Sequence, residues 1–448
     1  MSFDAVLIAN RGEIALRVIE ACRELGLTSV VAYSEADADM PYLDLADRAI
    51  CIGPAEPAKS YLNIAAIISA AGLNDVGAIH PGYGFLAENP HFVEVCEEHH
   101  LTFIGPSQAV MALLGDKVAA RQAVAEMGVP VLPGIPLPEG SDEQTAAADA
   151  IGYPVLIKSV YGGGGRGMRW VDDPSEFLSK VAAASEEARI ATGSGELYLE
   201  KALPDPRHIE VQIMADDQGN VIHIGERDCS IQRRHQKLIE ETPAPNLPQE
   251  TREAIWEAAV NASRAVGYRN AGTVEFVVAP DHSFYFIEMN ARIQVEHSVS
   301  EMICGMNLIK EQIRVALGES VSHKQEDIPF RGHAIECRIN AEDPDNAFMP
   351  SCGIVTMEQL PGGNGIRFDS ALHQGMKVQP YYDSLIGKLI AWGPSRDEAI
   401  IRMETSLERL QLSGIRTTTP LLMEILKHPA FREGRVTTGF LDEHFPQK

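Results

Sequence analysis

The sequence lacks the features that mark membrane-spanning or disulfide-rich secreted proteins. No apolar run approaches the roughly 18 residues that a membrane-spanning helix needs. The opening stretch has no charged segment followed by an apolar one, so we expect no signal peptide. The seven cysteines form no C-x-x-C pair, which predicts reduced, mostly buried thiols in a cytoplasmic protein.

Positive charge is also scarce. The chain has 38 Lys and Arg against 63 Asp and Glu, and its net charge is −25 at pH 7. Nucleic acids and anionic membranes require a basic surface, so we expect neither as a partner. No G-x-G-x-x-G follows the first predicted strand, which argues against a nicotinamide cofactor. What remains is a chain of 448 residues, 45% hydrophobic, long enough for two to four domains.

Alternating apolar segments indicate the fold class. AVLIAN predicts a buried strand, Gly12 permits a turn, and a helical stripe follows up to Gly26. LTSVVAYS and VGAIHPGYG predict further strands, so we expect an open, mostly parallel α/β sheet. A small subdomain is predicted over residues 131–203. The part from Gly332 on combines short strands and turns with a helix that begins at a Ser395–Glu398 capping box.

The stretch FYFIEMNARIQVEH has an unusual alternation. If the chain stays extended, every second residue points to the same side. That side is then polar and carries Glu288, Asn290, Arg292, Gln294 and Glu296. We expect these five groups to line one site.

The predicted hairpin TVEFVVAPDHSFYFIEMN explains part of this pattern. A turn between Asp281 and His282 places Glu275 directly across from Glu288, with Cβ atoms about 5 Å apart. Opposed carboxylates repel, and a divalent cation between them removes the repulsion. Asn290, one pleat further along, offers a third oxygen, and such hard ligands favour Mg²⁺ or Mn²⁺. The alternative is that one carboxylate reaches solvent or a lysine.

Residues 162–168, GGGGRGM, form a glycine-rich loop between two predicted strands. Its backbone N–H groups can surround phosphate oxygens, although such a loop can also be a plain hairpin turn. It is not a P-loop, because no Lys-Ser/Thr follows. Lys158 and Lys117 can reach the phosphates, or be ordinary surface lysines.

The stretch ERDCSIQRRHQK gathers five basic residues in an acidic chain. It can be a solvated face or an anion-attracting patch. Together with the paired carboxylates, the glycine loop and the lysines, it describes a site for phosphoryl transfer to a second anionic substrate.

These residues together resemble the biotin carboxylase family of the ATP-grasp superfamily. The stretches that carry the resemblance appear in family order over nearly the whole chain: ANRGEIALR, HPGYGFLAEN, FIGP with GDK, GGGGRGM, ERDCSIQRRHQK, EMNARIQVEH and ECRINAEDP. The resemblance implies an ATP-grasp α/β fold in three parts. These are an N-terminal open parallel α/β domain (1–114), an ATP-grasp domain (115–330) with a mobile glycine-loop lid (131–203), and a C-terminal α+β domain (331–446).

The resemblance also implies a role for each matched residue. ATP would be bound by Lys117, Lys158, Gly163, Gly164, Gly165, Gly167, Met168, Glu200, Lys201, Leu203, His208, Gln232 and His235. Glu275, Glu288 and Asn290 would hold Mg²⁺ or Mn²⁺, with two ions expected. Bicarbonate would be held by Lys237, Arg292, Gln294 and Val295. Glu296 would deprotonate bicarbonate, Arg338 would stabilise the biotin enolate, and Tyr83 would lie beside the ureido ring.

The implied reaction is the carboxylation of biotin through carboxyphosphate, the first half-reaction of an acetyl-CoA carboxylase or a related acyl-CoA or pyruvate carboxylase. Lys377 follows Met376 but lacks the second Met of a biotin-carrying Met-Lys-Met, so the carrier and the carboxyltransferase are expected to be other chains. The resemblance also suggests a homodimer.

The family match leaves some questions open. Tyr161, Ala291 and Ser298 depart from the usual family residues, which leaves lid kinetics and partner choice open, and the final acceptor is open as well. The alternative functions are another ATP-grasp ligase that joins a carboxylate to an amine, and a catalytically silent nucleotide-binding subunit.

Overall fold

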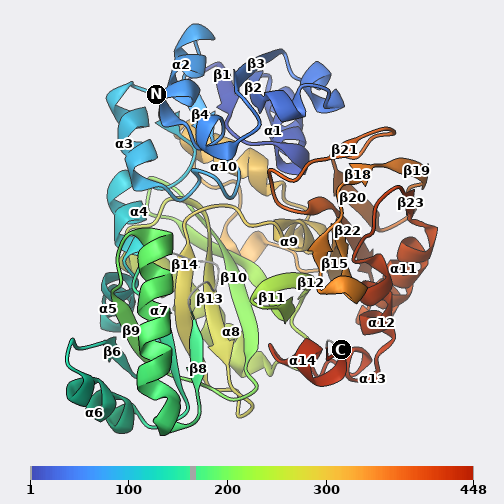
Figure 1. The fold of residues 1–448 in the computed structure, drawn as a ribbon. Coiled ribbons are helices and arrows are strands. Elements are labelled where there is room, and N and C mark those ends of the chain that lie inside the picture. The colour runs from blue at the N-terminus through green and yellow to red at the C-terminus, as the bar shows by residue number, and fades with distance from the viewer. Residues whose placement is uncertain (1–2, 162–167, 447–448) are drawn as a thin grey trace.

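The structure, a computed structural model, describes residues 3–161 and 168–446. The N-terminal part contains the predicted parallel sheet, which is confirmed (Figure 1). Its five strands are ordered β3-β2-β1-β4-β5, with bounds β1 Ala5–Ile8, β2 Thr28–Ser34, β3 Arg48–Gly53, β4 Ala78–His80 and β5 Thr102–Phe103. Three helices accompany it: α1 Gly12–Leu25, α2 Ile64–Leu73 and α3 Pro90–Glu98. Strand β3, with exposed residues at its start, was not predicted.

Helix α1 forms where the apolar spacing predicted it. Ile14, Val18, Ile19 and Cys22 are buried on one face. Gly26 ends the helix in the left-handed region at φ 70°, a conformation that costs glycine little. The amino end of α1 thereby lies just after β1, close to the loop that carries Tyr83.

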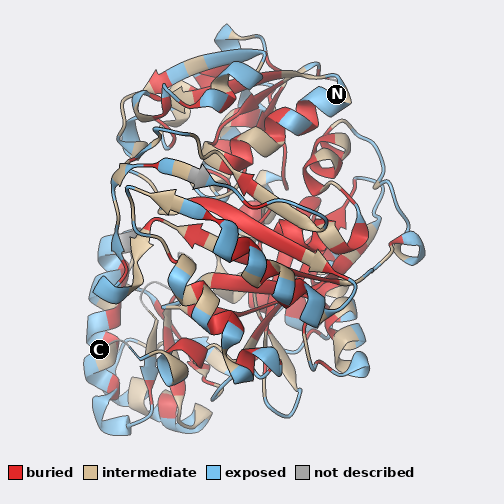
Figure 2. Ribbon diagram, turned by 90° about the vertical axis from the view of Figure 1, so that its right-hand side faces the viewer, coloured by how far each residue is buried: buried red, intermediate tan, exposed pale blue. Residues whose placement is uncertain are grey.

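An eight-stranded antiparallel sheet forms the centre of the molecule. Its order is β14-β13-β10-β11-β12-β15-β22-β20. The strands are β10 Arg207–Ala215, β11 Val221–Arg233, β12 Gln236–Thr242, β13 Asn270–Val278, β14 Phe284–Asn290, β15 His333–Asn340, β20 Ile366–Ser370 and β22 Leu385–Gly393. Figure 2 shows its strands as mostly buried. Because β12 pairs with β15, one continuous sheet crosses the predicted boundary near residue 330, which the sequence did not indicate.

Helices pack around this sheet. They are α8 Gln249–Ala265, α9 His297–Cys304 and α10 Leu308–Ala316, with α4 Gln108–Gly115 and α5 Lys117–Glu126 leading in from the N-terminal part. The C-terminal part adds α11 Arg396–Arg409, α12 Thr419–Lys427, α13 Pro429–Arg432 and α14 Phe440–His444. Ser395 accepts a hydrogen bond from the Glu398 N–H at 3.3 Å, as the capping box predicts.

Residues 134–201 build a separate four-stranded sheet of order β6-β9-β7-β8 (Figure 1). Its strands are β6 Gly134–Pro136, β7 Val155–Ser159, β8 Arg169–Val171 and β9 Leu197–Lys201, covered by α6 Ser141–Ile151 and α7 Phe177–Thr192. Val155, Ile157, Val171 and Phe177 share its small apolar core. The glycine loop joins β7 to β8, and its residues Gly163, Gly164, Gly165 and Gly167 lie outside the described residues.

The hairpin of β13 and β14 confirms one prediction and corrects two others. Glu275 does pair with Glu288, but a register shift follows at once, so Phe276 pairs with Phe286 and the turn is not centred where the sequence suggested. The extended conformation expected up to Glu296 is also wrong. Strand β14 ends at Asn290, and the chain turns into α9, because the His297 N–H donates to Gln294 O at 3.3 Å and the Val299 N–H to Glu296 O at 3.3 Å.

The thiols and helices agree with the compositional expectations. All seven cysteines are free, and only Cys51 and Cys352 are exposed. Among the described residues, every helix is too short or too polar to traverse a lipid bilayer.

Acid stability is expected to depend on Glu241, a buried carboxylate of β12. Burial opposes its charge, yet hydrogen bonds from His333 at 2.7 Å and from Arg396 at 2.7 and 2.9 Å lower its pKa to about 2. A lowered folded-state pKa stabilises the protein above the ordinary pKa of 4.5, and this stability is lost as the pH falls toward 2. Glu241→Gln should therefore cost on the order of 3 kcal/mol at pH 7 and less at pH 3. Urea unfolding at both pH values measures this, and an equal loss at both would contradict it.

Candidate active site

Lys237, on β12, is the centre of a buried charged cluster. Its Nζ lies 2.5 Å from Glu210, 2.6 Å from Glu296 and 3.2 Å from Glu275. These three acids come from β10, the segment before α9, and β13, so strand pairing brings together residues far apart in the sequence. Burial opposes the charge of Lys237, but the three carboxylates raise its pKa well above the ordinary value. Lys237 therefore stays positively charged, and it lies on one face of the large sheet.

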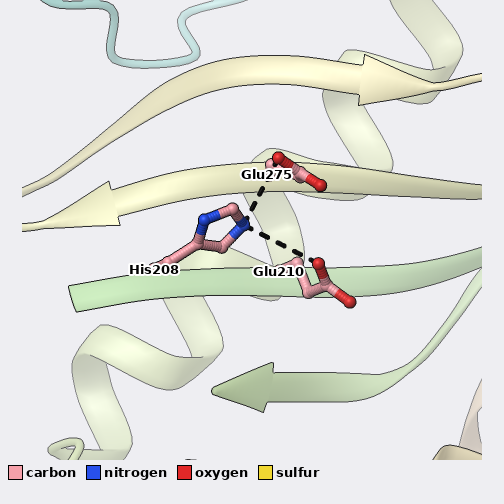
Figure 3. Close-up of side chains that lie close together, drawn as sticks. All are labelled: His208, Glu210 and Glu275. Carbon is pink, nitrogen blue, oxygen red and sulfur yellow. Dashed lines mark ion pairs between the residues drawn. The ribbon is translucent and has the colours of Figure 1, made fainter. Parts of the chain in front are cut away.

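His208 lies beside the same cluster, between Glu275 and Glu210 (Figure 3). Its Nε2 is 3.3 Å from Glu275 and 3.7 Å from Glu210. The spacing of these three residues could hold a metal ion. However, Arg227 and Lys237 occupy the two oxygens of Glu210, so we interpret the group as ion pairs.

The predicted metal ligands differ in how their charge is offset. Glu275 Oε1 accepts hydrogen bonds from Asn290 Nδ2 and Gln294 Nε2, both at 2.9 Å, in addition to Lys237. Within the described residues, the one ion-pair partner of Glu288 is Lys117, 3.9 Å away. The pKa of Glu288 is raised by burial and then by the charge of Glu275. Lys237 thus offsets the charge of Glu275 in the absence of a metal, as in the alternative in which one carboxylate reaches a lysine.

The residues nevertheless suit a divalent ion. Glu275 and Glu288 are cross-strand neighbours, and Asn290 follows Glu288 by one pleat. All three offer oxygen, as Mg²⁺ and Mn²⁺ prefer. Burial and the charge of Glu275 still raise the pKa of Glu288 despite Lys117, and this is the observation that favours an added positive charge there.

The segment after β14 still brings its polar groups to one place, although it is not a strand. Arg292 lies 3.0 Å from Glu88 and donates to Asn290 Oδ1 at 3.0 Å. Gln294 is buried against Glu275. The Val295 carbonyl accepts from Lys388 at 2.8 Å. The polar side chains therefore lie close together although the backbone after Asn290 is irregular. The sequence predicted that a regular strand would bring them together.

Glu296 is held between two cations. Its Oε1 accepts from Lys237 at 2.6 Å, and its Oε2 accepts from Arg338 of β15 at 2.9 Å. Burial opposes its charge, but Lys237 and Arg338 lower its pKa well below the ordinary value. Glu240, which also binds Arg338, has its pKa raised by burial to about 7. Glu296 is therefore ionised at neutral pH, the state that a base needs before it takes a proton.

The residues predicted to meet the nucleotide lie where the small sheet faces the large one. Glu200 forms ion pairs with Lys158 and Arg121. Lys201 points elsewhere, because its Nζ donates to the carbonyls of Gly152 and Tyr153 at 2.9 Å. Gln232 is buried in β11, His235 is exposed at the β11–β12 turn, and Leu203 and Met168 are half-buried.

Tyr83 lies in a cavity between the N-terminal and C-terminal parts. The cavity has a volume of about 110 Å³, and its lining includes Arg11, Glu13, Tyr83 and Asp383. The Tyr83 hydroxyl donates to Glu13 Oε1.

Several residues of the site escaped the sequence analysis. Glu210 is a fully buried partner of Lys237, and Arg121, Glu88 and Glu240 hold predicted site residues in place. Arg227, one of the five basic residues of ERDCSIQRRHQK, is the fully buried partner of Glu210. A charged residue in an apolar strand such as RHIEVQIMA is a signal that could have pointed to Glu210.

Comparison with known proteins identifies the family. Three family models match: "Biotin carboxylase, N-terminal domain" over residues 2–111, "Carbamoyl-phosphate synthase L chain, ATP binding domain" over 116–324, and "Biotin carboxylase C-terminal domain" over 336–443. A biotin carboxylase of Pseudomonas aeruginosa is 52% identical over 98% of each chain. The chain belongs to the biotin carboxylase family.

Two other similar proteins belong to different carboxylases. A pyruvate carboxylase subunit of Methanothermobacter thermautotrophicus is 50% identical over 99% of this chain and 90% of its own. The biotin carboxylase domain dimer of Hydrogenobacter thermophilus 2-oxoglutarate carboxylase, in complex with MgADP, ADP and bicarbonate, has a TM-score of 0.95 and 48% identity, covering 99% and 98% of the two chains. The ATP-grasp fold and an ATP-dependent biotin carboxylase activity, predicted from the sequence, are thereby confirmed.

Proposed function

We propose that the cluster around Glu296 activates bicarbonate and transfers its carbon to biotin. The observation that carries this assignment is the position of Glu296, whose two oxygens are bound by Lys237 and Arg338 at 2.6 and 2.9 Å. One carboxylate between two fixed cations suits a base whose substrate is a small anion. Arg292 and Gln294, which contact Asn290 and Glu275, and the Val295 backbone of the same segment would complete the bicarbonate site.

The nucleotide is proposed to lie between the small and large sheets. Lys117 and Lys158 would contact its phosphates together with the glycine loop, and His208, Gln232 and His235 would line the large-sheet side. Glu200, Lys201 and Leu203 would face the base of the nucleotide, although the Lys201 ammonium is engaged elsewhere, which leaves its backbone for that role. Glu275, Glu288 and Asn290 would hold the divalent ion, which when bound offsets phosphate charge.

The chemistry of the proposed steps follows from these positions. Bicarbonate gives its proton to Glu296, and one of its oxygens attacks the γ-phosphorus of ATP, which releases ADP. The resulting carboxyphosphate breaks into CO₂ and phosphate. The phosphate takes the N1′ proton of biotin, and the nitrogen then bonds to CO₂. Arg338 would offset the enolate charge, and Tyr83 would contact the ring.

The partners follow from this reaction. Carboxylation of biotin is a half-reaction, and its role implies a biotin carrier and a carboxyltransferase as partners in the complete carboxylase. We propose that both are separate chains and that the acceptor is set by the transferase. Lys377 supports this, because it belongs to a two-residue strand, β21 Lys377–Val378, paired with β18 Gly353–Ile354. We also propose that the protein forms a homodimer, because a similar biotin carboxylase domain is a dimer. We further propose three domains, residues 1–114, 115–330 with the lid 131–203, and 331–446. The matched ranges of the family models support these boundaries.

A coupled assay tests the proposed reaction. The purified protein should release phosphate from ATP only with bicarbonate and Mg²⁺ present, and faster when free biotin is added, with carboxybiotin as the product. Turnover that needs an amine and no bicarbonate would instead indicate a carboxylate–amine ligase. Absence of any turnover in a folded sample that binds nucleotide would indicate a silent subunit.

A further inference from the structure

Lys388, in the middle of β22, is a fully buried lysine outside the groups assigned above. Its exposed fraction is 0%. Its Nζ donates to the Val295 carbonyl at 2.8 Å and lies 3.1 Å from Glu13 and 3.7 Å from Asp369. An ammonium in the interior is costly to desolvate, and an apolar side chain there is often more stabilising. A buried, ion-paired lysine at this position is therefore a candidate for a role that an apolar residue cannot fill.

Glu13 connects Lys388 to the N-terminal part of the chain. Glu13 lies in the first turn of α1 and is 6% exposed. Its Oε1 accepts the hydrogen bond of the Tyr83 hydroxyl and is also the atom nearest to Lys388. A continuous polar path thus runs from Tyr83 through Glu13 and Lys388 to the Val295 carbonyl.

The far end of this path is the residue before Glu296. Within the described residues, the segment between β14 and α9 pairs with no strand, so side-chain contacts rather than strand pairing determine where Glu296 projects. The bond from Lys388 to the Val295 carbonyl is one of them. In the pairing of β15 with β22, Lys388 is also the direct neighbour of Arg338, the second cation on Glu296. Lys388 therefore contacts the backbone beside Glu296 and the strand that carries Arg338.

We propose that Lys388 and Glu13 are positioning residues that hold the Val295–Glu296 backbone in the geometry needed for bicarbonate, and that they link it to Tyr83. This inference depends on the proposed roles of Val295 and Glu296. A carbonyl released from Lys388 can turn away, which moves both a bicarbonate contact and the base. Small displacements of that kind weaken catalysis far more than they weaken folding.

The test compares Lys388→Met with the double variant Lys388→Met/Glu13→Gln. The single variant leaves Glu13 without its cation and can fail to fold, whereas Asp369 keeps its ion pair with Arg367 at 2.6 Å. The double variant removes one positive and one negative charge together, which largely restores neutrality. We expect the double variant to raise the KM for bicarbonate about tenfold and to lower kcat about tenfold, with the KM for ATP unchanged within about twofold. Steady-state phosphate release measures all three.

Glu241→Gln is the matched control, because it also removes a buried, ion-paired carboxylate but from the Arg396 side of β12. It should lower stability and leave the KM for bicarbonate unchanged. Equal bicarbonate constants in the wild type and the folded double variant would overturn the proposal, as would a tenfold rise in the control. Glu296→Gln in the same assay distinguishes a failure of the proposed base from a failure of the positioning proposal. If it stays active, the proposed base is wrong; if it is inactive while the double variant behaves as wild type, only the positioning proposal fails.

Discussion

Glu296→Gln is expected to lower bicarbonate-dependent ATP turnover about a thousandfold, while ATP binding stays near normal. Glutamine keeps the size and one acceptor oxygen but cannot take a proton from bicarbonate, and general base catalysis contributes about 10²- to 10⁴-fold. The nucleotide residues lie on other strands and keep their contacts. Phosphate release measures turnover, and calorimetric titration with MgADP measures binding.

The matched control for this variant is Glu226→Gln on β11. Glu226 is also buried and ion-paired, but it binds Arg252 at 2.8 Å and Trp256 at 2.8 Å on the α8 side of the sheet. Its loss should reduce stability and leave turnover per folded molecule unchanged. Retention of more than about a tenth of wild-type turnover by Glu296→Gln would be too much for a missing base.

Glu288→Lys is expected to abolish Mg²⁺-dependent nucleotide binding. The substitution removes one proposed metal ligand and adds a cation opposite Glu275 and near Lys117, where it competes for the position of the ion. Even outer-sphere partners of a metal contribute about 10- to 100-fold to its affinity, so the loss of a direct ligand should exceed about a hundredfold. Nucleotide titrations with and without Mg²⁺ or Mn²⁺ measure the effect.

Two further variants serve as controls for the nucleotide titrations. Glu288→Gln retains an oxygen without the charge and should fall between wild type and Glu288→Lys. Glu253→Lys makes the same charge change at an exposed position of α8 and should bind nucleotide normally. An unchanged Mg²⁺ requirement in Glu288→Lys would show that the facing carboxylates of the hairpin do not hold the ion.

The β13–β14 hairpin shows which structural features could be predicted from the local sequence. The pairing of Glu275 with Glu288 was predicted from a turn that the structure places differently, and it holds because the register shift between Glu275 and Phe276 offsets the misplaced turn. The turn itself and the extended run to Glu296 were predicted wrongly. A register shift and the start of α9 intervene, and both depend on contacts with distant segments that carry no local signal.

The amino-acid order alone was sufficient for the parallel N-terminal sheet, which follows from periodicity, and for the family, which follows from the resemblance of its motifs. The ligands that the resemblance implies stay proposals. The surroundings of those ligands were settled only when β10, β12, β13 and β15 paired in one sheet. Glu210 and Lys388 look like isolated charges among apolar strand residues, and no local pattern says which opposite charge each will meet. These ion pairs are essential because a charge removed from water needs an opposite charge within a few ångströms. Only the tertiary fold brings the two charges together.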